Sequence, residues 1–161
     1  MTEDEYVEEI WRLRIAKEFE KALNLTERAV ETYQNSAELQ CWFGELILLS
    51  DETRYRAADA LSAYEKAVAL DPEWAEPYEN IGYLYDTYFN DFGQAESAFR
   101  KAIELGAEAE SYTGLAGVLA QRGDQIAEIL SFLDNCPFAD ESAIKKMRSE
   151  IEEGQWSPVQ D

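Results

Sequence analysis

Apolar and small residues recur in the middle of the chain at the spacing of an α-helix. Two motifs carry the pattern: Tyr78-x-x-Ile81-Gly82-x-x-Tyr85, followed by Ala95-x-x-x-Phe99-x-x-Ala102. Residues three or four apart share one face of a helix, so each motif predicts an amphipathic helix. Between the motifs, Asn90 can adopt the left-handed conformation of a turn. Residues 75–108 are therefore predicted to form a helix, a turn and a second helix.

The same pattern returns at a fixed distance on both sides of this segment. Upstream, the motif Ala60-x-x-x-Tyr64-x-x-Ala67 lies 35 residues before its counterpart, and Phe43-Gly44 precedes it. Downstream, Tyr112-x-x-Leu115-Ala116-x-x-Leu119 lies 34 residues after its counterpart. Near the start, Phe19, Ala22 and Ala29 indicate the second helix of a further, degenerate unit. A fixed period of this length indicates a repeat protein.

The motifs and their period resemble the tetratricopeptide repeat family, whose unit of about 34 residues folds as helix, turn, helix. The resemblance implies an all-α fold, a right-handed superhelical solenoid of helical hairpins with a C-terminal capping helix. Residues 1–154 are expected to form a single domain of nine helices. Its units fall at residues 3–36 (degenerate), 37–74, 75–108 and 109–139, with the capping helix at 140–153.

Residues 155–161 are expected to be a flexible tail. As alternatives, Trp156 in this tail folds back on the repeat array or docks into a neighbouring molecule.

Other residues mark the ends of the predicted helices. Thr2 and Glu5 have the spacing of a capping box at the start of the first helix. Asp140 or Ser142 is a candidate N-cap of the capping helix, and Gly154 can terminate that helix.

The unit at 37–74 carries an insertion. Gly44 to Ala60 spans 16 residues, whereas Gly82 to Ala95 spans 13, so the turn at residues 50–55 is longer than its counterpart. Repeat arrays usually place such insertions on one face.

The composition limits both the partners and the chemistry. The chain has 14 Lys and Arg against 34 Asp and Glu, a net charge of −20, and no histidine. The negative charge opposes binding to nucleic acid and to anionic membranes, and it favours basic partners. Without histidine, the commonest general base and the usual imidazole metal ligand are missing, and no other catalytic constellation is evident. We therefore expect no enzymatic activity, no metal site and no cofactor.

The sequence gives no indication of export or membrane insertion. The first residues are acidic where a secretory signal is basic, and no apolar run of about 18 residues occurs. We expect a cytoplasmic protein. Cys41 and Cys136 lie far apart in the sequence, which predicts two buried, reduced thiols.

In tetratricopeptide repeat proteins, the first helix of each hairpin lines a concave groove with the residues that packing leaves free. In the unit at 75–108 these positions form an acidic and aromatic stripe, and the stripes of all four units together hold eight acids against the single Arg14. The candidate groove residues are Trp11, Glu38, Trp42, Glu45, Glu76, Glu79, Asn80, Tyr83, Asp86 and Glu110.

These stripes favour a basic partner. Family members that clamp a peptide carboxylate use lysine, arginine and asparagine there, and only Asn80 matches that set. The cation positions hold Val7, Cys41, Glu110 and Gly114 instead. An acidic groove suits a segment rich in Lys or Arg, whose side chains can lie against aromatic rings. We expect a non-catalytic interaction module or adaptor; the alternative is a dedicated chaperone or inhibitor of one basic client.

Several of these features have a second interpretation. Trp11 and Trp42 either face the groove or pack between neighbouring first helices. The acids either bind a ligand or only keep the protein soluble. Gly114 and Gly117, which cost helix stability, either allow close helix packing or leave room for a bulky side chain of a partner.

Overall fold

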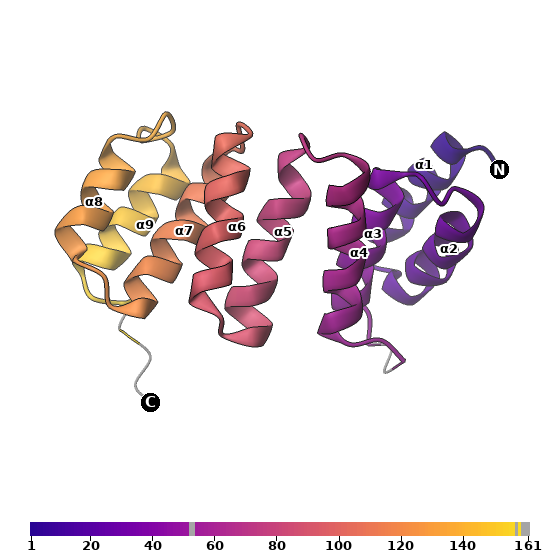
Figure 1. The fold of residues 1–161 in the computed structure, drawn as a ribbon, viewed down its shortest axis with the longest axis horizontal. Helices are drawn as coiled ribbons and strands as arrows, with labels where there is room; N and C mark the ends of the chain where they lie inside the picture. Colours follow the sequence, from indigo (N-terminus) through magenta and orange to yellow (C-terminus); the bar gives the residue numbers. More distant parts are fainter. Residues whose placement is uncertain (52–53, 157, 159–161) are drawn as a thin grey trace. The chain divides into compact units, whose positions relative to one another are not determined.

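The computed structural model describes residues 1–51, 54–156 and 158 of the chain (Figure 1). Within that part, all regular structure is helical, and nine α-helices follow one another with a π-helical turn, η1 (Tyr85–Phe89), after the fifth. The α-helices are α1 (Glu3–Ile15), α2 (Phe19–Thr32), α3 (Ala37–Leu49), α4 (Ala57–Leu70), α5 (Ala75–Leu84), α6 (Phe92–Glu104), α7 (Ala109–Arg122), α8 (Ile126–Asp134) and α9 (Ser142–Glu152). The predicted all-α fold is confirmed, whereas η1 is not among the predicted elements.

The chain divides into two compact units, an N-terminal unit of Met1–Pro77 and a C-terminal unit of Tyr78–Asp161. The single domain expected over residues 1–154 stays a prediction.

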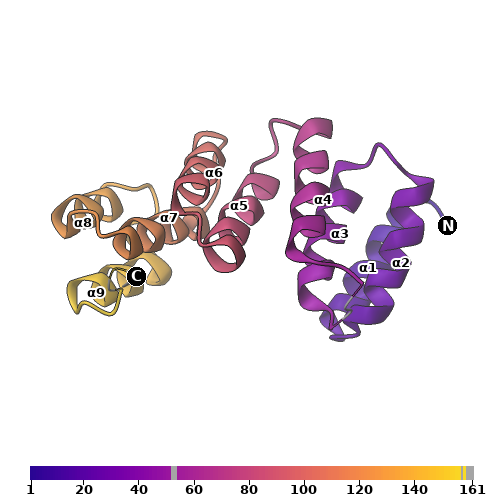
Figure 2. The same ribbon diagram turned by 60° about the horizontal axis from the view of Figure 1, so that its bottom comes forward.

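The N-terminal unit is built from α1 to α4 (Figure 2). Helix α2 contacts both α1 and α3, and α3 contacts α4. The side chains of Ile10, Leu23 and Leu39 are completely buried between them. Helix α4 approaches α3 closely because Gly44 has no side chain: the Tyr64 ring lies 2.6 Å from the position that a Cβ on Gly44 would occupy. The small and aromatic residues of the repeat motif therefore set the spacing between α3 and α4.

The predicted capping box begins α1. The Thr2 hydroxyl accepts a hydrogen bond from the Glu5 amide at 3.2 Å, and the Glu5 carboxylate accepts one from the Thr2 amide at 2.7 Å. Two backbone N–H groups that a helix start leaves without a partner are thereby satisfied.

The C-terminal end of the inserted turn is held against α2. Within the turn, Glu52 and Thr53 lie outside the described residues. The Tyr55 hydroxyl donates a hydrogen bond to the Glu27 carboxylate, and Arg54 donates to Asn24 at 2.6 Å. The Tyr55 ring also meets Phe43 edge to face, with 5.4 Å between the ring centroids. Burial, followed by the bond to Glu27, raises the pKa of Tyr55 to about 12.

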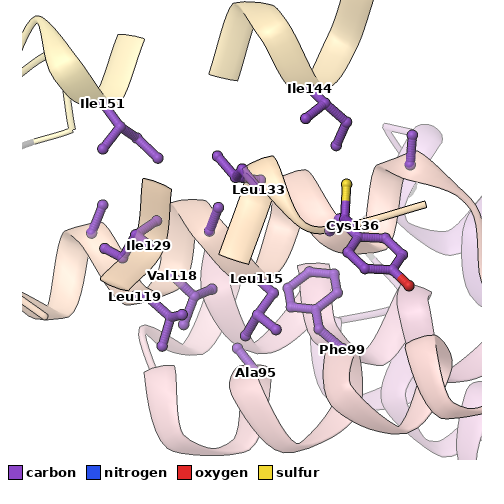
Figure 3. Packing of buried hydrophobic residues seen from close by; sticks show 14 residues of the cluster. Ala95, Phe99, Leu115, Val118, Leu119, Ile129, Leu133, Cys136, Ile144 and Ile151 are labelled. Atoms are coloured by element: carbon purple, nitrogen blue, oxygen red, sulfur yellow. The ribbon is translucent and has the colours of Figure 1, made fainter. Parts of the chain in front are cut away.

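The core of the C-terminal unit gathers side chains from α6 to α9 (Figure 3). Phe99 of α6 is completely buried and belongs to this core. The remaining large members are Tyr112, Leu115, Val118 and Leu119 of α7, Ile129 and Leu133 of α8, and Ile144 and Ile151 of α9. The second helix of one repeat and the whole of the next therefore share one core.

Helix α9 covers α7 and α8, as a capping helix should. Ile144 and Ile151 form its buried side, with Met147 partly buried between them. Its predicted N-cap is wrong. The helix starts at Ser142 itself, and its N-cap is Glu141, whose side chain makes no capping bond. Gly154 does follow the helix in the left-handed conformation, with a φ of 72°, as expected for a terminator.

The turn after α5 follows the predicted conformation at Asn90. This residue has φ 50° and ψ 33°, which is the left-handed region that Asn tolerates. The next residue, Asp91, caps α6 by accepting a hydrogen bond from the Gln94 amide at 3.0 Å.

Candidate protein-binding surface

In the N-terminal unit, α1 and α3 place an arginine over a tryptophan. The guanidinium carbon of Arg14 lies 5.6 Å from the centroid of the Trp42 ring. The Nη2 and Nε groups of the same arginine donate to Glu45 Oε1 at 2.5 and 2.8 Å. A guanidinium group is well satisfied when its face meets an aromatic ring and its edge meets a carboxylate. The chain's own Arg14 thus shows how a cation sits on this surface.

A cleft of about 70 Å³ adjoins this cation site. It has room for a group of a few heavy atoms and shares Trp42 and Glu45 with the cation site. Its walls are the side chains of Glu38, Cys41, Trp42, Glu45, Trp74 and Glu76. Three carboxylates and two indole rings therefore converge on a small space.

Trp11 and Trp42 are not core residues. Trp11 on α1 is 53% exposed, and Ile15, one turn further along the helix, is 57% exposed. Trp42 is partly covered by Arg14. Trp11 does not line the cleft, so the N-terminal unit offers an exposed aromatic side chain on α1 and a separate acidic cleft on α3.

In the C-terminal unit, the predicted stripe on α5 and η1 is hydrogen-bonded to α7. The Ser111 hydroxyl donates to the Glu79 carboxylate, and the Gln121 amide donates to Asp86 at 3.2 Å. Tyr83 reaches the same helix by donating its hydroxyl to the Glu110 carbonyl oxygen at 2.9 Å. These three side chains therefore connect two successive first helices, which sequence analysis did not predict.

Partial burial changes the proton affinities of this stripe. Removal from water raises the pKa of Glu79 and of Asp86, although the hydrogen bonds from Ser111 and Gln121 act in the opposite direction. Partial burial, reinforced by the nearby Glu79 charge, raises the pKa of Tyr83 to about 12. The carboxylates on this face thus carry their charge at an energetic cost.

The ten candidate residues fall into two groups of five. Trp11, Glu38, Trp42, Glu45 and Glu76 lie in the N-terminal unit, and Glu79, Asn80, Tyr83, Asp86 and Glu110 lie in the C-terminal unit. Asn80 is partly buried on α5, and the Glu110 side chain is exposed at the start of α7. Each group is a surface of its own unit.

The two helical glycines of α7 have different neighbours. A Cβ on Gly114 would stand 2.5 Å from the Phe99 ring, so this glycine allows close helix packing. A Cβ on Gly117 would stand 2.9 Å from the indole ring of Trp156. Gly117 thus leaves room for a bulky side chain, and the chain's own tail supplies it. The indole N–H of Trp156 also donates to the Glu150 carboxylate at 3.1 Å.

Three residues of these surfaces are not predicted from the sequence: Trp74, which lines the cleft, and Ser111 and Gln121, which bond to Glu79 and Asp86. Trp74 lies in the turn directly before α5, outside the helical stripes on which the prediction relied. A search of the turns that precede first helices would have found it. Ser111 and Gln121 are polar residues of α7, and no spacing in the sequence pairs them with Glu79 and Asp86.

The described residues contain no candidate metal site and no disulfide. Among them, no group of three or more acidic or cysteine side chains is arranged to hold a metal ion. Cys41 and Cys136 are buried and are not joined by a disulfide, as predicted. In the same part of the chain, every helix is too short or too polar to span a lipid bilayer.

Comparison with known proteins adds relatives of low identity. No protein-family model matches the chain. The chain is 27% identical over 112 residues to heat shock protein STI1 of Saccharomyces cerevisiae, a match that covers 66% of this chain and 18% of that protein. The chain therefore spans less than a fifth of the length of this relative.

Solved structures of tetratricopeptide repeat proteins align with most of the chain. The domain of Sgt2 from Aspergillus fumigatus aligns with a TM-score of 0.63 at 18% identity, over 99% of this chain and 87% of that one. MamA aligns with a TM-score of 0.68 at 19% identity, over 95% and 87%. YrrB, described as having an unusual peptide-binding site, aligns with a TM-score of 0.65 at 18% identity, over 93% and 84%. The resemblance inferred from the sequence motifs is confirmed, and the chain has the tetratricopeptide repeat fold.

Proposed function

We propose that the chain is a non-catalytic protein-interaction module that binds a basic segment of a partner protein. The observation that carries this proposal is the position of Arg14, with its guanidinium group over Trp42 and bonded to Glu45. This pair accommodates an arginine side chain from the chain itself. An arginine or lysine of a partner would find the same ring and carboxylates in the adjoining cleft.

The charge of the cleft supports a cationic ligand. Glu38, Glu45 and Glu76 all line it, and Glu45 already binds one cation, the Arg14 guanidinium group. The net charge of −20 acts in the same direction at longer range, because it attracts basic segments and repels nucleic acid and anionic membranes. Both arguments favour a protein or peptide partner rich in Lys or Arg.

The C-terminal unit would contribute mainly its negative charge to binding, and few direct hydrogen bonds to the partner. Glu79, Tyr83 and Asp86 are already bonded to α7, so a ligand that bonded to them directly would have to displace these contacts. Asn80 and Glu110 complete the proposed binding residues of this unit. The description of YrrB as a peptide-binding protein supports a binding role for a chain of the same fold.

Aromatic contacts would provide much of the affinity. One exposed ion pair stabilises a complex by about 0.2–1 kcal/mol, whereas a cation over a desolvated aromatic ring contributes up to about 2 kcal/mol. The carboxylates would chiefly select basic partners and accelerate their association. Trp42, Trp74 and the exposed Trp11 are the rings that we propose to contact the partner.

Selection of peptides on the full chain tests this proposal. A random peptide library displayed on phage is panned against the wild-type protein, and one enriched peptide is synthesised with a fluorescent label. We expect the enriched peptides to contain Arg or Lys. Binding, measured by fluorescence anisotropy, should weaken when the salt concentration rises from about 50 mM to about 500 mM, because the charges become screened.

Two charge-reversal variants locate the site. Glu38→Lys/Glu76→Lys reverses two charges in the cleft, and Glu20→Lys/Glu65→Lys makes the same change on exposed residues of α2 and α4. The first variant should weaken binding of the labelled peptide by about tenfold or more, and the second by much less. Equal losses in both variants would leave only non-specific attraction to an acidic protein, and enrichment of peptides without basic residues would refute a basic partner.

A dedicated chaperone or inhibitor for one basic client is the second candidate function. The similarity to a heat shock protein favours it. Co-expression separates the two candidates: a dedicated chaperone would make one client soluble or non-toxic, whereas an adaptor would bind several partners without changing their solubility.

A further inference from the structure

Trp156, near the end of the chain, lies on the face of α7 where Gly117 leaves room for a bulky side chain. The Trp156 ring lies over Gly117, with ring carbons 2.9 and 3.2 Å from the position of an added Cβ. The ring is partly buried and packs against the core of the C-terminal unit. The tail thus places its one aromatic side chain in the notch that Gly117 leaves on α7.

Two further contacts hold the tail and its indole ring in this position. The indole N–H donates to Glu150 on α9 at 3.1 Å, so the polar atom of the ring has a partner. Two residues later, Pro158 lies 3.4 Å from the position of an added Cβ on Gly123, the residue that ends α7. The tail therefore lies beside α7 at two glycines, Gly117 and Gly123. A Cβ on Gly117 would overlap the indole ring, whereas a Cβ on Gly123 would only touch Pro158.

We propose that the notch over Gly117 is a binding subsite for an indole side chain, which Trp156 occupies as an internal ligand. A partner segment that carries a tryptophan takes the same seat after the tail has left. This inference rests on the proposed function, because it assigns an aromatic anchor to the partner in addition to basic residues. The occupant is the indole observed in the structure, with Gly117 providing the space and Glu150 the hydrogen-bond acceptor.

Occupation by the tail would regulate the surface. A tethered side chain is present at an effective concentration of the order of millimolar, so it competes strongly with a free segment. The apparent affinity for a partner is reduced in proportion to the fraction of molecules in which the seat is open. Removal of Trp156 should therefore increase binding of an indole-bearing segment without creating any new contact.

Nuclear magnetic resonance tests whether the tail docks. The indole N–H resonance of Trp156 is assigned in the ¹⁵N-labelled full chain by its loss in Trp156→Phe. We expect this resonance to be protected from hydrogen exchange in the wild type, shifted in Gly117→Ala and unprotected in Gly117→Leu. Ala127→Leu, which adds a similar volume on an exposed position of α8, should leave it unchanged. Circular dichroism verifies that the variants are folded.

A tail peptide in trans tests the subsite itself. The probe is a labelled synthetic peptide of residues 153–161, and its binding is measured by anisotropy. It should bind the Trp156→Ala chain at least about tenfold more tightly than the wild type, and the Gly117→Leu/Trp156→Ala chain no better than the wild type. A probe in which alanine replaces the tryptophan should not bind.

Three results would overturn the proposal. They are an unprotected Trp156 indole in the wild type, equal binding of the probe to wild type and Trp156→Ala, and binding that survives Gly117→Leu. These outcomes are independent of the proposed function, because the probe contains no lysine or arginine. Loss of basic-peptide binding in the cleft variants and loss of tail binding in the Gly117 variants can therefore be distinguished.

Discussion

The Phe99 ring lies 2.8 Å from the position that a Cβ on Gly82 would occupy. The same ring lies 2.5 Å from the corresponding position on Gly114, so one aromatic side chain of α6 fills the space beside a glycine of α5 and a glycine of α7. Phe99 itself is completely buried. The same contact between a glycine and an aromatic ring occurs between Gly44 and Tyr64, so it sets the spacing of the two helices in both central hairpins, α3/α4 and α5/α6.

Gly82→Ala should destabilise the protein although alanine favours helices. The added methyl group would overlap the Phe99 ring, and the buried ring has little space to move away. Overpacking of this kind costs about 1–3 kcal/mol, which exceeds the gain of about 1 kcal/mol in helix propensity. Urea unfolding followed by circular dichroism measures the change.

Gly93→Ala is the matched control for this prediction. Gly93 also lies in a helix, α6, but the nearest atom to an added Cβ is the Asp91 carboxylate oxygen at 3.5 Å, an ordinary contact. This variant should gain about 0.4–1 kcal/mol. A stabilising Gly82→Ala, or a loss of equal size in both variants, would contradict the packing argument.

Neutralising Glu79 should stabilise the protein at neutral pH. Its folded-state pKa is raised by burial, so the folded state holds the proton more tightly than the unfolded state does. Stability therefore falls as the pH rises from below the unfolded pKa through the raised folded pKa. Glu79→Gln can keep the Ser111 bond without the charge. It should melt at a higher temperature than the wild type at pH 7, and the difference should shrink as the pH falls to about 4.

A general charge effect must be separated from this one, because removal of any acid relieves repulsion in a chain of net charge −20. Glu38→Gln changes the net charge equally at an exposed position of α3. The melting-temperature gain of Glu79→Gln should exceed that of Glu38→Gln. Gains of the same size would mean that burial of Glu79 has no consequence for stability.

More of the fold than of the candidate site can be predicted from the sequence. The spacing of Gly82, Phe99 and their counterparts predicts the hairpins. Two helices pack closely where a glycine on one helix faces a large side chain on the other, and this pairing fixes the positions of both residues in the sequence. The bonds from Glu79 and Asp86 to α7 join residues more than thirty positions apart, and they depend on side-chain conformations that no period encodes. The seat of Trp156 is hidden for a related reason, since a short tail has no repeat that would predict its contacts.

Arg14→Ala should strengthen binding of the selected basic peptide described above. The substitution uncovers the Trp42 ring and frees the Glu45 carboxylate for a cation of the partner. We expect a gain in affinity of about threefold to tenfold. The cost in stability should stay below about 1 kcal/mol, because the ion pair is about one third exposed.

Arg12→Ala is the matched control on α1. Arg12 pairs with Glu9 on the same helix, and its substitution by alanine removes the same charge as Arg14→Ala does. Anisotropy titrations with both variants should show a clear gain only for Arg14→Ala. If the affinity for the peptide rises equally in both variants, the change in net charge explains the effect, and Arg14 does not compete with the peptide for Trp42 and Glu45.

Tyr83→Phe should lower the free energy of unfolding at neutral pH. It should also make this free energy fall less steeply as the pH becomes alkaline. At pH 7 the variant loses the hydrogen bond to the Glu110 carbonyl oxygen, which contributes about 0.5–1.5 kcal/mol. Partial burial raises the folded-state pKa of Tyr83 to about 12, compared with 10.0 for an unperturbed phenol. Between these values the unfolded state has lost its proton and the folded state retains it. The stabilisation from this group is therefore complete below pH 10 and is lost as the pH rises through 12.

Urea unfolding at several pH values from neutral to alkaline provides the measurement. The stability of the wild type should fall more steeply above about pH 10 than that of Tyr83→Phe, so the two curves should approach each other. Tyr55→Phe is the comparison on the N-terminal unit, because burial also raises the pKa of Tyr55 to about 12. Parallel curves for wild type and Tyr83→Phe would show that the Tyr83 hydroxyl ionises as easily in the folded chain as in the unfolded one, and coincident curves at neutral pH would remove the hydrogen bond to α7 as a stabilising contact.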